Sequence, residues 1–264
     1  MHAFFETHWL ILYIFLISMG FLAGFIDAVA GGGGLISVPA LAFTGMPIAF
    51  VLGTNKLQSS IGTGTAVYKY YRDGLINFKT VYRGLLMGFV GACLGAITAN
   101  YVSNQFMRYI VPFLMLAVFI FNLFNKSLGV KEGKKRMDEL VFFSIFGFIL
   151  GFYDAFFGPG VGNFWIIAIV FFLGYTFLNA SGYAKVLNLK SNLFSLVVFI
   201  WFGKVNFALG FIMACGQFFG GYVGAKMVIL KGSKLVRPFF MTVVSINIIM
   251  LFYQMIFSGG ISAG

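Results

Sequence analysis

Long apolar runs separated by short polar stretches make up nearly the whole chain. The runs cover about residues 9–44, 47–68, 84–102, 109–125, 140–174, 178–202, 206–230 and 238–257. Most of them approach the ~20 residues that an α-helix needs to cross a bilayer. The pattern predicts an all-α, polytopic membrane protein with lipid as its main solvent.

Two of these runs, 9–44 and 140–174, are too long for a single crossing. Both are interrupted by glycines, which are Gly31, Gly32, Gly33 and Gly34 in the first and Gly158, Gly160 and Gly162 in the second. Glycine is costly inside a helix but adopts conformations that other residues avoid. We therefore predict a broken helix at the start of each half of the chain.

The two halves resemble each other in sequence. GFLAGFID at 20–27 matches GFILGFYD at 147–154, and farther along Lys56 matches Lys185 at an offset of 129. Further glycine, asparagine, alanine and arginine residues align at the same offset, in order. Such self-similarity predicts two structural repeats. We place them at 9–125 and 140–257, with a connecting loop at 126–139.

Basic residues are distributed oppositely in equivalent loops. Between the second and third segments the first half has four Lys or Arg and the second half has one; between the third and fourth segments the numbers are reversed. Because basic loops stay in the cytoplasm, the halves are predicted to have inverted topology. Inversion needs an odd number of crossings per half, so the broken segment is expected to enter and return. The basic central loop is then cytoplasmic, and both termini lie outside.

Composition excludes several classes of protein. The chain is 60% hydrophobic and 9% charged, against about 25% charged in soluble domains. Its net charge of +11 comes mostly from the short loops, which argues against a nucleic-acid partner. The only histidines, His2 and His8, are at the N-terminus, and Cys93 and Cys215 lie in apolar, Gly-rich runs. We expect no catalytic residue, metal site or cofactor, and no enzymatic activity.

Asp27 and Asp154 are the acidic residues that lie inside apolar segments, and they are repeat equivalents. Each precedes the first glycine of its break by four residues, near a helix C-terminus, where the helix dipole disfavours negative charge. A carboxylate at this depth is costly and usually functional. We expect a role in proton coupling; the alternative is an ion pair that holds the break together.

The glycine breaks themselves are candidates for anion binding. A half-helix that begins there presents free backbone N–H groups, and discontinuous helices form many transporter sites at the midplane. The alternative is that glycine only permits close helix packing.

A polar stripe follows the second segment of each half. Lys56, Ser59 and Thr63 share one helical face beside Asn55, and the same spacing recurs one half later. The recurring residues are Lys185, Asn188 and Asn192. We expect these side chains to bind substrate; the alternative is that the lysines snorkel to an interface. Lys190 aligns with the apolar Ile61 of the first half, and we therefore expect Lys190 to lie at the periphery of the site.

These motifs resemble those of the sulfite/organosulfonate exporter (TauE/SafE-type) family. The resemblance rests on AGFIDAVAGGGG followed by Pro39, on GTNKLQ at 53–58, and on GFYDAFFGPG with the stretch around Lys185. It implies a secondary transporter in a prokaryotic plasma membrane that exports a small sulfur-containing anion with protons. The sulfur in this expectation comes from the resemblance alone.

Three other classes compete with a coupled transporter. An intramembrane aspartyl protease also needs two embedded aspartates, but Asp27 lacks the Gly-x-Gly-Asp context. A passive channel is compatible with the sequence, although charges of both signs favour a coupled site over a single-sign ring. A scaffold without transport leaves four intramembrane charges unexplained.

Overall fold

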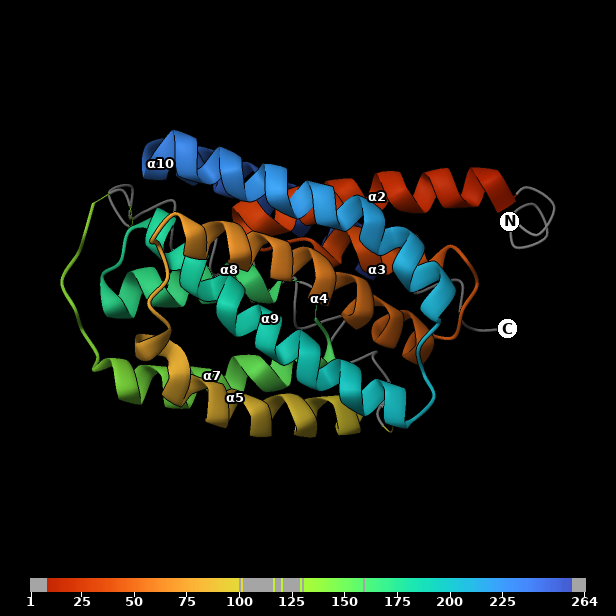
Figure 1. Ribbon diagram of the computed structural model, residues 1–264, viewed down its shortest axis with the longest axis horizontal. Helices are drawn as coiled ribbons and strands as arrows, with labels where there is room; N and C mark the ends of the chain where they lie inside the picture. The colour runs from red at the N-terminus through yellow and green to blue at the C-terminus, as the bar shows by residue number, and fades with distance from the viewer. Residues whose placement is uncertain are drawn as a thin grey trace.

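The computed structural model describes residues 9–99, 101, 116, 120, 129, 131–158 and 160–257. Its elements are α2 (Trp9–Ala30), α3 (Gly34–Ala42), α4 (Ile48–Arg72), α5 (Phe78–Ala99), α7 (Glu139–Phe156), α8 (Val161–Ala168), the π-helical turn η1 (Ile169–Leu173), α9 (Phe177–Trp201) and α10 (Phe207–Phe257) (Figure 1). No strand occurs in these ranges. The predicted all-α class is confirmed.

Four helical stretches among the described residues are long and apolar enough to cross a membrane. They are Trp9–Ala30, Glu139–Phe156, Phe177–Trp201 and Phe207–Gly232. Helix α4 is as long as α9, but its polar residues lower its hydropathy, and most of them are buried inside the protein. The structure is that of a multi-pass membrane protein.

Both long runs are broken at their glycines, as predicted. Helix α2 ends at Ala30, and Gly31 follows with φ +84° before α3 begins. Helix α7 ends at Phe156, and Gly158 and Gly160 have φ +88° and +84°. After the first break the chain turns back along α2, since a Cβ on Gly33 would lie 2.6 Å from the carbonyl oxygen of Ala23.

Other predicted bounds shift. Helix α5 begins at Phe78, ahead of the expected start at residue 84. The expected segments 206–230 and 238–257 meet within α10 at Gly232, whose φ of 66° and ψ of −179° are not helical. The expected segment 109–125 lies outside the described residues except for Leu116 and Ile120.

Each half packs its third helix against the other half. Helix α10 packs on α2 and α4, and α5 packs on α7 and α9. Glycines make these contacts close, because a Cβ on Gly220 would lie 2.0 Å from the Phe21 carbonyl oxygen and one on Gly91 would lie 2.2 Å from that of Phe148. Backbone-to-backbone packing of this kind is how helices associate in lipid, where no hydrophobic force acts between them.

Helices α4 and α9 cross at the centre and run in opposite directions (Figure 1). The start of α4 lies beside the end of α9, where a Cβ on Gly53 would meet the Lys204 carbonyl oxygen at 2.0 Å. The start of α9 lies beside the end of α4, where a Cβ on Gly182 would meet the Leu75 carbonyl oxygen at 3.4 Å. Gly53 and Gly182 are repeat equivalents, so the same contact occurs twice. Which ends of α4 and α9 lie on the cytoplasmic side of a membrane stays a prediction.

Candidate functional site

The two glycine breaks touch each other. A Cβ on Gly31 would lie 2.3 Å from the carbonyl carbon of Gly162, and a Cβ on Gly162 would lie 2.4 Å from the Cα of Gly31. Side chains are therefore excluded on both backbones at this contact. It brings the last turns of α2 and α7, which carry Asp27 and Asp154, to the same region of the molecule.

Each aspartate forms an ion pair with the lysine of the opposite half. Lys56 on α4 lies 2.7 Å from Asp154 Oδ1, and Lys185 on α9 lies 2.8 Å from Asp27 Oδ2. The lysines are only 1% and 0% exposed, so neither snorkels to an interface. Charges at such positions are tolerated because they are paired. The pairs also connect the halves.

The Asp154 carboxylate is held by several donors. Lys56 Nζ donates to Asp154 Oδ1 and also to the Asp154 carbonyl oxygen at 2.6 Å and to Asn192 Oδ1 at 3.0 Å. Ser191 donates a hydrogen bond to the other carboxylate oxygen, Oδ2. Asn192 in turn donates to Asn188 Oδ1 at 2.6 Å. The network joins α4, α7 and α9.

The Asp27 carboxylate is held more loosely. Thr63 donates to Asp27 Oδ2 at 3.4 Å, beyond the usual range for an O–H donor. The Lys185 ammonium lies close enough to pair with it but makes no well-aligned hydrogen bond with any described residue. Thr63 and Asn192 are repeat equivalents, so the sequence difference between them is one source of this looseness.

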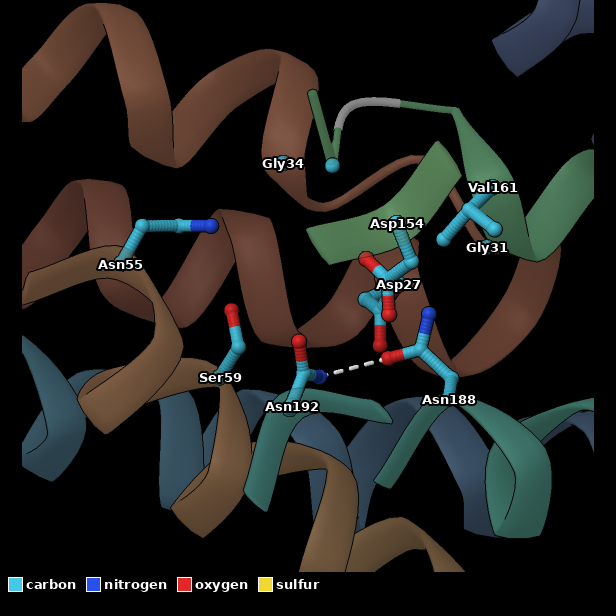
Figure 2. Close-up of a pocket in the computed structure, with 10 residues that line it drawn as sticks. Asp27, Gly31, Gly34, Asn55, Ser59, Asp154, Val161, Asn188 and Asn192 are labelled. Atoms are coloured by element: carbon cyan, nitrogen blue, oxygen red, sulfur yellow. Dashed lines mark hydrogen bonds between the residues drawn. The ribbon is translucent and has the colours of Figure 1, made fainter. Parts of the chain in front are cut away.

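A third polar group ties α3 to α4. Ser37 and Gln58 both donate to Asn55 Oδ1 at 2.6 Å, and Gln58 also donates to Ser59 Oγ at 3.1 Å. With its oxygen occupied, Asn55 directs its amide nitrogen inward, as Figure 2 shows.

These groups surround a small buried cavity (Figure 2). It is lined by Asp27, Gly31, Gly34, Asn55, Ser59, Asp154, Gly158, Val161, Asn188 and Asn192. Gly34 and Val161 are the first residues of the half-helices α3 and α8. The volume open to a water-sized sphere is about 20 Å³, enough for about one water molecule. An anion with several heavy atoms needs a more open conformation.

Most predicted site residues meet at this cavity, but not all. Gly32, Gly33, Gly160 and Gly162 are absent from its described lining; Gly33 packs on Asp27, and Gly162 packs on Gly31. Lys56, Thr63 and Lys185 act on the aspartates instead of lining the cavity.

Lys190 corrects one expectation. It is 7% exposed, not peripheral, and it lies within electrostatic range of Asp154. Its ammonium occupies the space that a side chain on Gly88 of α5 would take. Repeat alignment misled here, because Ile61 at the equivalent position suggested an apolar environment.

Ser191 was missed for a related reason. Its repeat equivalent is Gly62, which has no polar atom to offer. Its position three residues after Asn188, on the polar face of α9, was the available signal.

The buried ionisable side chains carry an excess of positive charge. Among the described residues that are buried, three are lysines (Lys56, Lys185, Lys190) and two are aspartates (Asp27, Asp154). When all are ionised, one positive charge is left over. The surplus charge is that of Lys190, which lies against Gly88 of α5 and not in the described lining of the cavity.

The chain is similar to membrane transporter proteins along most of its length. The family model described as "Sulfite exporter TauE/SafE" matches residues 16–251. The chain is 42% identical over 223 residues to a probable membrane transporter protein of Haemophilus influenzae, covering 84% of this chain and 88% of that protein. It is 39% identical over 241 residues to the probable membrane transporter protein YfcA of Escherichia coli, covering 91% and 89%. A probable membrane transporter protein of Methanocaldococcus jannaschii is 26% identical over 165 residues, covering 60% and 61%.

No solved structure matches the chain. The family match spans both glycine breaks and both ion pairs, and it omits only the start of α2 and the end of α10. The chain therefore belongs to the TauE/SafE sulfite exporter family of membrane transporters.

Proposed function

We propose that this transporter exports a small sulfur-containing anion, sulfite or an organosulfonate, coupled to protons, through a midplane site between the two repeats. The observation that carries the proposal is the cavity at which two half-helices begin and two lysine–aspartate pairs meet. The proposed membrane is the prokaryotic plasma membrane.

Several donors around the cavity suit a sulfur oxyanion. The first residues of α3 and α8 line it, and a helix N-terminus presents N–H groups and the positive end of the dipole. The amide of Asn55 and the hydroxyl of Ser59 lie on the opposite wall, and Asn188 and Asn192 lie beside them. Neutral donors of this kind bind sulfonate or sulfite oxygens without fixing the rest of the substrate.

The ion pairs supply the means of coupling. An anion that enters the cavity competes with a carboxylate for the lysine ammonium. A carboxylate that loses its cation inside the protein is strongly disfavoured, so it takes up a proton. Anion binding and proton uptake then support each other.

The small cavity supports alternating access. In this conformation the space admits about one water molecule, so it must widen before an anion can enter. Because α4 and α9 carry the lysines and run in opposite directions, movement between them would open the cavity toward one face or the other.

The distribution of charge supports the proposed orientation. Helix α4 ends with Lys69 and Arg72, and the α4–α5 connection lies at the same end of the molecule as the loop 131–138 (Figure 1). That loop is itself basic and is bound to the end of η1, where Arg136 N donates to the Phe172 carbonyl oxygen at 2.8 Å. By the positive-inside rule this end is cytoplasmic.

The test is flux of sulfite, thiosulfate, sulfoacetate and sulfate into proteoliposomes under an imposed pH gradient. We expect saturable flux of a sulfur anion that depends on the gradient, and loss of that dependence with retained anion binding in the double variant Asp27→Asn, Asp154→Asn. Gradient-dependent flux in the double variant would exclude the carboxylates as coupling groups. Unsaturable flux that ignores the gradient in the wild type would favour a channel.

A further inference from the structure

The two half-sites are related by the repeat but are not chemically equal. At the positions that surround each aspartate, the second half carries Lys190, Ser191 and Asn192, where the first half carries Ile61, Gly62 and Thr63. These differences fall on helices α4 and α9, which carry the two lysines of the ion pairs.

Two of these differences, Lys190 and Ser191, favour a permanently charged Asp154. Lys56 from α4 pairs with it, Lys190 from α9 lies within its electrostatic range, and Ser191 donates to its second oxygen. Tyr153, the preceding residue on α7, is a further titratable group within electrostatic range of Asp154. Donors and cations of this kind stabilise the ionised carboxylate, so Asp154 has little reason to bind a proton during transport.

Asp27 has fewer partners. A single lysine, Lys185 from α9, faces it, and Thr63 from α4 donates at 3.4 Å. Tyr70 of α4 also lies within electrostatic range of Asp27, but its hydroxyl donates to the Ala28 carbonyl oxygen at 3.0 Å. No described residue supplies the hydrogen bond that Ser191 gives Asp154, because Gly62 stands there.

The two lysines also differ in their hydrogen bonds, and Lys185 has fewer acceptors than Lys56. Lys56 donates to three acceptors, whereas Lys185 is fully buried without a well-aligned hydrogen bond to any described residue. A buried ammonium without aligned acceptors gains most from an incoming anion. The side chain of Asp27 is also 11% exposed, against 3% for that of Asp154.

We propose, on the basis of the proposed function, that the Lys185–Asp27 pair alone binds the anion and the coupling proton. The Lys56–Asp154 pair is then an ionic brace, an ion pair that stays intact and holds the two halves together. Entry of the anion draws the Lys185 ammonium away from Asp27, and Asp27 Oδ2 then accepts one proton from water. Asp154 stays ionised throughout.

This division fixes the stoichiometry and favours a dianion. A dianion that leaves the cell with one proton carries one net negative charge outward, and the inside-negative membrane potential favours that movement. If both aspartates took up protons, the cargo would be electroneutral and the potential would contribute nothing. One responsive pair therefore suits export of sulfite or a sulfonate that bears a second negative charge.

Carbodiimide labelling tests the division without any assumption about transport. Hydrophobic carbodiimides modify protonated carboxyls in apolar surroundings, and mass spectrometry locates the adduct. In reconstituted wild type at pH 6–7 we expect Asp27 to be labelled roughly tenfold more than Asp154, because one hydrogen bond to a charged group is worth at least that factor. Sulfite should raise the labelling of Asp27 further. Equal labelling, preference for Asp154, or no adduct at Asp27 even at pH 5 overturns the proposal.

Two variants test the cause within the same protein by making the surroundings of Asp154 more like those of Asp27. Lys190→Ile installs the residue that the first half carries, and Ser191→Ala removes the donor that the first half lacks. Both should make Asp154 reactive while Asp27 keeps its reactivity; unchanged labelling of Asp154 in both folded variants contradicts the assigned cause.

Proton uptake on binding separates this proposal from the proposed function. With sulfoacetate, which carries two negative charges at pH 7, a pH indicator in weakly buffered solution should report one proton per anion bound, and Asp27→Asn should abolish the uptake. Two protons, or uptake that survives in Asp27→Asn, refutes the division while leaving a sulfur-anion transporter. Selective labelling of Asp27 without binding of any sulfur anion would instead leave the division and remove the proposed substrate.

Discussion

The Lys56–Asp154 brace predicts a large pairwise coupling energy. The two atoms are 2.7 Å apart, both side chains are at most 3% exposed, and the pair joins α4 to α7 across the halves. Removal of one partner from a buried pair costs about 3–5 kcal/mol of unfolding free energy, because the other charge is left uncompensated. Replacement of both by apolar residues of similar volume is often neutral.

The structure refines the magnitude. In Lys56→Met the carboxylate of Asp154 keeps Ser191 and the nearby Lys190, so we expect a loss near the lower limit, about 3 kcal/mol. In Asp154→Leu the ammonium of Lys56 keeps only Asn192 and a backbone carbonyl, and the loss should reach about 3–5 kcal/mol. The double variant should lie within about 1 kcal/mol of the wild type.

The assay is a double-mutant cycle by equilibrium unfolding in mixed micelles of SDS and a mild detergent, followed by fluorescence of the buried Trp165. The matched control is the Lys69–Asp73 pair, which has the same separation of 2.7 Å but lies at the end of α4 with side chains 20% and 30% exposed. We expect about 0.3–0.5 kcal/mol of coupling there and at least about 2 kcal/mol for the buried pair. Equal coupling in the two pairs would refute the reasoning from burial.

Two further outcomes follow from the fold. Accessibility tags at residue 130 and after the C-terminus should report opposite sides of the membrane, with residue 130 cytoplasmic; both tags inside would make the charge reversal between loops accidental. Gly162→Ala should destabilise the protein by about 1–3 kcal/mol in the same unfolding assay and reduce flux, because its Cβ would meet the Gly31 backbone at 2.4 Å. Gly64→Ala, whose Cβ would meet only a Leu189 methyl at 3.8 Å, should be neutral or slightly stabilising; a matching loss in both variants would show that crowding at the breaks is not the cause.

The parts of the fold that depend on local composition were readable from the sequence. Apolar runs of bilayer length predict helices wherever they occur, because a backbone in lipid has to satisfy its own hydrogen bonds. The breaks at Gly31 and Gly158 were also predictable from the sequence. Glycines interrupt each apolar run at a defined place, and the helices end there. The residue types of the site were readable too, since intramembrane charges are rare enough to stand out.

The pairing of those charges was not readable. The sequence placed Asp27 and Lys56 in one half and Asp154 and Lys185 in the other, and the simplest reading joins neighbours within a half. The structure pairs them across the halves instead, because the antiparallel crossing of α4 and α9 carries each lysine to the break of the opposite half. The pattern of residues along a single segment does not indicate which helix faces pack against each other.

The inequality of the half-sites also required the tertiary structure. Repeat alignment treats Lys190 and Ser191 as departures from Ile61 and Gly62, and it gives no reason to connect them with Asp154. Only packing shows that Ser191 donates to that carboxylate and that Lys190 lies near it. Hydrophobicity and helix length are properties of a segment and are written in its sequence, whereas the environment of a buried charge is set by the side chains that several segments bring to one place.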